Sequence, residues 1–206
     1  MYTPKINQVL DRALLIEAMR ANPFAILFGP CMANDPGGMQ ATHLPLVVKD
    51  EGEHGVLEGH FAKANPHWKS LSDQEVLVVF NGPHSYVSPS LYDEPLSVPT
   101  WNYIAVHASG ILAVIDDDEE KDRVLSDLIE ANEPVYADKW RQMPDGFRRT
   151  MLVGIMGFRV PIARIEGKFK LSQNRPETDR RRVFEAHASG DEDQKSLAAW
   201  MTRLSV

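Results

Sequence analysis

The stretch TWNYIAVHASG, residues 100–110, sets two aromatic side chains, an asparagine and a histidine among β-branched and small apolar residues. Such a run favours a β-strand, in which successive side chains point to opposite faces. Trp101 and Tyr103 then share one face, whereas Asn102 and Ile104 share the other. We expect one face to belong to the core and the other to offer aromatic rings to a ligand; the alternative is that both faces only pack within the protein.

Short apolar runs of strand length lie on both sides of this stretch. They occupy residues 24–28, 39–48, 56–61, 76–80, 101–115, 151–160 and 161–169. Gly29-Pro30 and Asn81-Gly82-Pro83 are turn formers and are predicted to end two of these strands. Helical spacing predicts a first helix that Asn7 caps and Asn22-Pro23 stops. It also predicts further helices at 135–142, from Pro176 onwards and at 196–204.

The acidic run Asp116–Glu120 has the composition of a metal site, but a helix start explains it better. Acidic side chains are stabilised at the positive end of the helix dipole, and Val124, Leu125 and Leu128 follow at helical spacing. A helix is therefore predicted to begin here.

Several short strands, one acidic helical hairpin and helices near both ends predict an α+β fold. The architecture they favour is a small closed or split β-barrel with flanking helices. We place the barrel domain at residues 1–175 and a C-terminal helical extension, packed on the barrel, at 176–206. No dinucleotide-binding glycine motif and no P-loop occurs in the sequence.

Composition narrows the class of protein. The chain has 206 residues, of which 43% are hydrophobic and 25% charged, so a folded protein is expected. It contains no apolar run of about 20 residues, the length that a membrane helix needs. The single Cys31 excludes an internal disulfide, and we expect a cytoplasmic protein.

Charge argues against nonspecific attraction to DNA, since the formal net charge is −7. The basic runs Arg148-Arg149 and Arg180-Arg181-Arg182 stand near acidic residues, and the latter is predicted to form a solvated, salt-bridged helix face. The seven histidines include no HExxH pair, and no Cys/His framework is present, so no dedicated metal site is expected. A serine hydrolase is not indicated either, because the Gly-x-Ser-x-Gly motif is absent.

Five motifs in order give the chain a family resemblance. They are THLPL (42–46), GHFAKANPHWK (59–69), GPHSYVSPSLY (82–92), VPTWNY (98–103) and KFKLSQNRP (168–176). Together they resemble the PaiB family of FMN-binding negative transcriptional regulators, from residue 1 to about 184. This resemblance implies a predominantly antiparallel, FMN-binding split barrel of the pyridoxamine-phosphate-oxidase-like type, and a homodimer with the flavin at the subunit interface.

The resemblance also implies the residues that bind FMN. Thr42, His43 and Leu44 are expected along the flavin, and His60, Lys63 and Asn65 near its phosphate or ribityl chain. Tyr86, Ser88, Trp101 and Asn102 are expected to complete the pocket. Lys170, Ser172, Gln173 and Asn174 are expected to reach it from the same or the partner chain. These residue types suit the ligand, because a phosphate needs charge-assisted donors and the ring system needs aromatic or apolar faces.

Three functions stay open at the level of sequence. The family resemblance implies repression of transcription, although we find no helix-turn-helix with a basic recognition helix. The alternative is an FMN-dependent oxidoreductase or flavin reductase that acts on a small molecule, with His43, Tyr86 or Tyr103 as candidate proton donors. A flavin-binding interaction protein that senses redox state is the third.

Overall fold

The computed structural model describes residues 1–31 and 38–206, which divide into two compact units. Unit 1 consists of Met1–Ala18, Asn81–Val106 and Glu166–Val206; unit 2 consists of Met19–Phe80 and His107–Ile165. Residues 166–206 thus share unit 1 with two earlier stretches of chain. The domain boundary that we place after residue 175 stays a prediction.

The sheet of unit 1 is built from one short strand and parts of three long ones. The strands are β1 (Gln8–Val9), β6 (Glu75–Val87), β7 (Thr100–Ile111) and β10 (Arg164–Lys170), in the order β1-β10-β7-β6. On β7 the predicted alternation is confirmed: Asn102 and Ile104 are buried, whereas Trp101 is 52% exposed. The opening stretch therefore has one face in the core and one face that carries exposed rings.

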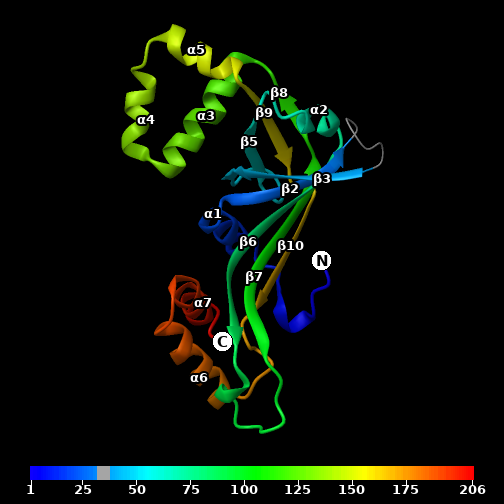
Figure 1. Ribbon diagram of the computed structural model, residues 1–206, viewed down its shortest axis with the longest axis vertical. Coiled ribbons are helices and arrows are strands. Elements are labelled where there is room, and N and C mark those ends of the chain that lie inside the picture. The colour runs from blue at the N-terminus through cyan, green and yellow to red at the C-terminus, as the bar shows by residue number, and fades with distance from the viewer. Residues whose placement is uncertain (32–37) are drawn as a thin grey trace. The chain divides into compact units, whose positions relative to one another are not determined.

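Helices cover one side of this sheet. Unit 1 contains a 3-10 turn η1 (Lys5–Asn7), most of α1 (Arg12–Ala21), η2 (Pro89–Leu91), α6 (Glu177–Ala188) and α7 (Glu192–Arg203). In Figure 1, α6 and α7 lie together along β6 and β7, and the N-terminal segment lies on the other side of these strands. Trp200 of α7 packs edge-on against Phe169 of β10, with ring centroids 5.1 Å apart. A capping box at Asp191 starts α7, because its side chain and that of Gln194 satisfy each other's backbone N–H.

Unit 2 contains antiparallel strands in two groups. In the first, β2 (Phe24–Cys31) pairs with β3 (Gly38–Pro45) and with the first part of β6. In the second, β4 (Val47–Lys49), β5 (Val56–Ala62), β9 (Ile155–Pro161) and β8 (Ala113–Ile115) follow one another in that order. The predicted α+β fold with antiparallel sheets and flanking helices is confirmed, and neither sheet closes on itself within the described residues.

The predicted acidic helix start is also confirmed. Unit 2 contains the helices α2 (His67–Leu71), α3 (Asp118–Asn132), α4 (Pro134–Arg141) and α5 (Asp145–Val153). Asp117 caps α3 by accepting hydrogen bonds from the backbone N–H groups of Glu119 and Glu120, both at 3.0 Å. Val124 and Leu128 of α3 are buried and pack with Ile115. Among the described residues, no helix is both long and apolar enough to cross a membrane.

A cluster of partly exposed charges surrounds the buried Glu58 where α3 packs on β5. The side chain of Glu58 is 1% exposed and accepts hydrogen bonds from Arg123 at 2.9 and 3.0 Å and from Arg159 at 2.7 Å. Lys49 lies 3.3 Å from the same carboxylate and 2.7 Å from that of Asp127. Because every one of these charges has a partner, the cluster ties the helix to three strands, β4, β5 and β9, without an isolated buried ion.

Two predicted turns are wrong. The chain continues as a strand through Gly29-Pro30 in β2 and through Asn81-Gly82-Pro83 in β6. A Cβ on Gly29 would lie 2.3 Å from a methyl group of Leu71, and one on Gly82 would lie 3.0 Å from the carbonyl oxygen of Ile104. These glycines therefore permit close packing, and Pro83 lies beyond Leu77–Val79, the residues of β6 that pair with β2.

Several predicted element boundaries also need correction. Asn7 does not cap the first helix: it ends a 3-10 turn, and Asp11 accepts the backbone N–H of Ala13 at 2.8 Å instead. The run predicted as a strand from Met151 is helical as far as Val153, and β9 starts two residues later. The last helix begins at Glu192 and not at residue 196, because the capping box fixes its start.

Candidate functional site

The predicted flavin residues fall into two groups, one in each unit. Unit 2 holds Thr42, His43, Leu44, His60, Lys63 and Asn65; unit 1 holds Tyr86, Ser88, Trp101, Asn102, Lys170, Ser172, Gln173 and Asn174. The groups are described separately.

Strand β3 separates the three residues that we predict along the flavin. Thr42 and Leu44 point to one face, and His43 points to the other, where its ring lies 6.1 Å from that of Phe24. Leu44 is buried, whereas His43 is exposed. Because neighbours on a strand face opposite ways, these three side chains do not line one surface within the unit.

Thr42 instead meets a histidine outside the predicted set. Its hydroxyl lies 2.8 Å from Nδ1 of His67, which is 1% exposed. Burial lowers the pKa of His67, although the nearby carbonyls of Gly29 and Pro30 oppose this shift. His67 is therefore neutral at pH 7 and holds the loop after β5 against β3.

His60 also differs from a typical phosphate ligand. It lines a cavity of about 290 Å³ whose other residues are Pro45, Leu128, Ile129, Asn132, Glu133 and Tyr136. Burial lowers the pKa of His60, so that its ring is neutral at pH 7. A neutral imidazole in a mostly apolar cavity offers a phosphate no charge-assisted hydrogen bond.

The loop after β5 presents the remaining residues of this group. The ammonium of Lys63 is 3.7 Å from the carboxylate of Asp116, and both side chains are well exposed. Asn65 accepts the backbone N–H of His67 at 3.1 Å through its side-chain oxygen. Lys63 is thus the one charged donor in the unit 2 group, and its weak, solvated ion pair leaves it able to meet an anion.

In unit 1, three rings gather on the outer face of β6 and β7. The ring of Trp101 lies 6.1 Å from that of Tyr86, at an interplanar angle of 78°, and 6.2 Å from that of His84. Each of the three side chains is about half exposed, at 52%, 49% and 51%. We call these three residues the ring cluster.

Lysines of β10 lie beside the ring cluster. Lys170 donates hydrogen bonds to the hydroxyl of Thr100 and, at 2.9 Å, to the carbonyl of Trp101. Two residues earlier on the same face, the ammonium of Lys168 lies 5.3 Å from the ring centroid of Tyr103. Burial and the charges of Lys168 and Arg175 lower the pKa of Lys170. An anion placed here would relieve this repulsion.

The other polar residues of unit 1 turn inward or remain local. Asn102 is fully buried, accepts a hydrogen bond from the Ser172 hydroxyl at 3.0 Å and donates one to Nε2 of His187 at 3.3 Å. Gln173 accepts the backbone N–H of Leu171 at 2.7 Å and donates to the carbonyl of Phe169 at 2.5 Å.

Ser88 accepts the backbone N–H of Ser90 at 3.2 Å, and Asn174 is exposed. Of the eight residues of this group, Tyr86, Trp101 and Lys170 therefore form one surface. Asn102 and Ser172 lie beneath it.

Comparisons with known proteins agree with this fold. The family model described as "Putative FMN-binding domain" matches residues 1–164. "Protease synthase and sporulation protein PAI 2" of Bacillus subtilis is 36% identical over 191 residues, which cover 90% of this chain and 88% of that protein. An uncharacterized protein of Emericella nidulans is 31% identical over 87% of each chain.

Solved structures resemble the chain in fold. A FAD- and heme-binding protein of Mycobacterium smegmatis superimposes with a TM-score of 0.62 at 16% identity, over 80% of this chain and 73% of its own. The flavocytochrome Anf3 of Azotobacter vinelandii gives the same TM-score and identity over 92% of this chain and 75% of its own.

The chain thus shares the split-barrel fold of these flavin-binding structures. It belongs to the FMN-binding domain family and is a PaiB-like member of it.

Proposed function

We propose that the chain binds FMN as a homodimer, with the flavin at the subunit interface, and acts in the cytoplasm as a negative regulator of transcription. The observation that carries the flavin part is the half-exposed pair Trp101 and Tyr86 beside Lys170. FMN has a planar, apolar ring system and an anionic phosphate. The ring system fits against the aromatic side chains, and the phosphate fits beside lysines that no carboxylate neutralises. The family description supports FMN, and the relative from Bacillus subtilis supports a regulatory role.

Charge pairing supports an anion next to the rings. Within the described residues, Lys168, Lys170 and Arg175 form no ion pair with a carboxylate, although the chain has 29 acidic residues. Lys168 and Lys170 are two residues apart on one strand face, which sets them about 7 Å apart. We propose that this pair attracts an anionic group of the cofactor, and that Lys63 in unit 2 is the competing candidate for the phosphate.

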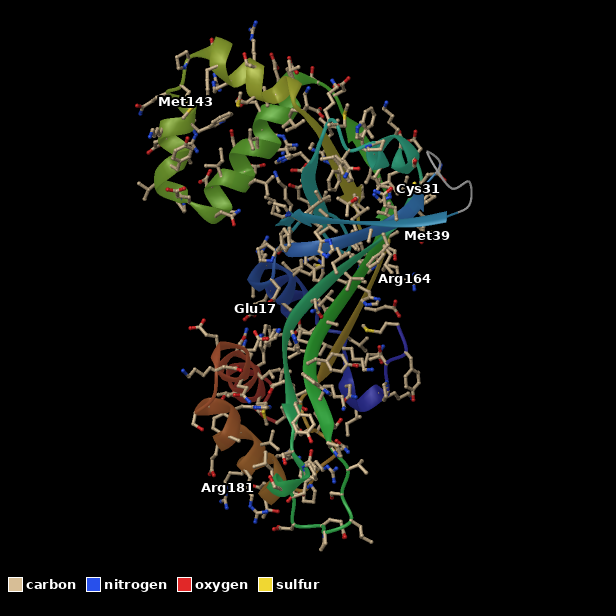
Figure 2. All side chains as sticks on the ribbon, viewed as in Figure 1. Glu17, Cys31, Met39, Met143, Arg164 and Arg181 are labelled. Carbon is tan, nitrogen blue, oxygen red and sulfur yellow. The ribbon has the colours of Figure 1, made fainter. Side chains whose placement is uncertain are left out.

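Direct contact with DNA finds less support. Arg182 is paired with Asp93 at 2.6 Å and with Asp179 at 3.7 Å. Arg181 is 72% exposed, points outward from α6 in Figure 2 and lies 3.8 Å from Glu185. The basic run of α6 is therefore largely neutralised, as the sequence predicts. We propose that regulation depends on flavin occupancy and reaches DNA through another factor.

The first test is a visible absorption spectrum of the purified protein after loading with FMN or FAD and removal of free flavin. We expect one FMN retained per chain and weaker retention of FAD. Loss of all flavin during gel filtration would refute the cofactor proposal. With FMN retained, bleaching of the flavin band by NAD(P)H at a catalytic rate would instead favour the oxidoreductase function.

Riboflavin lacks the phosphate of FMN. Comparing the binding of the two compounds therefore identifies the lysine that binds the phosphate. We expect Lys170→Ala to weaken FMN binding about 10-fold or more, because a charge-assisted hydrogen bond is lost, and to change riboflavin binding little. Both dissociation constants can be measured by quenching of flavin fluorescence. Lys139→Ala is the control, since Lys139 lies beside a ring, that of Tyr136, but is not among the predicted flavin residues. Should Lys63→Ala alone abolish the preference for FMN over riboflavin, the phosphate belongs to Lys63.

A further inference from the structure

A cavity of about 570 Å³ opens beside the ring cluster at the edge of unit 1. It is lined by His84, Ser85, Tyr86 and Trp101 from β6 and β7, and by Asp191, Glu192 and Asp193 from the start of α7. No Lys or Arg is among its lining residues. Aromatic rings therefore form one wall, and carboxylates form the other.

The rings form a corner of the kind that binds organic cations. Tyr86 meets Trp101 nearly edge-on, at 78°, so that two walls of the cavity are set almost at right angles. His84 flanks Trp101 on the other side, at an interplanar angle of 33°. A cation held against such ring faces is attracted by their negative quadrupoles, and quaternary ammonium groups are recognised in this way.

The carboxylates set the sign of charge that the cavity accepts. Asp191 is partly used, because it accepts the backbone N–H of Gln194 at 2.9 Å. Asp193 lies 3.5 Å from the His84 ring, and Glu192 is exposed. The helix dipole explains acidic residues at the start of α7. It does not explain why three half-exposed rings face them, and an anion would meet three negative charges in the cavity.

We propose that this cavity binds a small organic cation, an alkyl or quaternary ammonium compound, against Trp101 and Tyr86. This proposal deepens the proposed function and rests on it in one respect. Trp101 and Tyr86 are also the rings proposed to contact the flavin, so the cation would lie beside the flavin. It names the chemical class of small molecule that the protein admits there. The volume is large enough for a ligand of this kind.

Choline and its neutral isostere dimethylbutanol test the charge requirement at constant shape. FMN retention is measured first, without either compound, so that failure of the flavin proposal is seen separately. Both compounds are then titrated into the FMN-loaded protein by calorimetry, or into the flavin-free protein if no FMN is retained. We expect choline to bind at least about 10-fold more tightly than dimethylbutanol.

A double variant separates this site from the flavin. Glu192→Gln with Asp193→Asn should weaken choline binding about 10-fold and leave FMN retention unchanged, since neither residue belongs to the predicted flavin set. The matched control is Glu119→Gln with Glu120→Gln, which removes two charges from the start of α3. The cavity at that helix start has no aromatic ring among its lining residues. Equal binding of the two compounds, undiminished choline binding by the double variant, or no choline binding at tens of millimolar would each overturn the proposal.

Discussion

Replacement of Glu58 by Gln is expected to lower the free energy of unfolding by about 3 kcal/mol at pH 7. The Glu58 carboxylate is 1% exposed and is the anion that Arg123, Arg159 and Lys49 share. A glutamine keeps the volume but removes the negative charge. Lys49 and Arg123 would keep Asp127 as an anionic partner, whereas Arg159 would lose the carboxylate that it pairs with.

The same carboxylate gives the stability a defined pH dependence. Burial by itself would raise the pKa of Glu58, but the hydrogen bonds from Arg123 and Arg159 and the charge of Lys49 outweigh burial and lower the pKa from 4.5 to about 2. Because the pKa is lower in the folded state, the stabilisation is complete above pH 4.5 and is lost as the pH falls toward 2. The difference between the wild type and Glu58→Gln should therefore shrink over this range.

Urea unfolding at a series of pH values measures both effects. The control is Glu53→Gln, because the Glu53 side chain is 88% exposed, and its replacement should change stability by less than about 0.5 kcal/mol. If Glu58→Gln and Glu53→Gln have the same urea midpoint at pH 7, the charge cluster does not stabilise unit 2.

Local patterns in the sequence predict the elements whose cause is local. The alternation along residues 100–104 comes from the strand period, and the start of α3 comes from acidic side chains at a helix N-terminus; both are found as predicted. The turns predicted at Gly29-Pro30 and Asn81-Gly82-Pro83 are absent. The glycines instead allow close packing against Leu71 and Ile104, which are distant in sequence. Contacts of this kind leave no periodic signal.

The candidate site shows the same limit. Strand alternation places Thr42 and His43 on opposite faces of β3, and Asn102 and Trp101 on opposite faces of β7. The sequence is therefore enough to predict which way these side chains point. The resemblance nevertheless assigns all four to one pocket. The role of His187 left no signal, because its partner Asn102 lies 85 positions away. Only the three-dimensional structure brings His187 beneath the ring cluster.

Asn102→Ala is therefore expected to lower the free energy of unfolding by about 3 kcal/mol, although Asn102 is predicted as a flavin residue. Its loss leaves the Ser172 hydroxyl and Nε2 of His187 buried without a partner, and each unsatisfied group costs about 1–3 kcal/mol. Burial lowers the pKa of His187, so its ring is neutral at pH 7 and Nε2 can accept the amide hydrogen. Urea unfolding at pH 7 measures the loss, with Asn81→Ala, an exposed asparagine of β6, as the control.

FMN affinity decides whether Asn102 supports the site or contacts the cofactor. If Asn102 positions Trp101 from beneath, Ser172→Ala, which breaks the same network one bond further away, should lower stability by about 1 kcal/mol and weaken FMN binding in the same direction as Asn102→Ala. If Asn102 instead touches the flavin, Asn102→Ala weakens FMN binding and Ser172→Ala does not. Burial of both side chains favours the first result. Asn102 would then hold in place the strand on which Trp101 stands, and Trp101 would make the contact with the flavin.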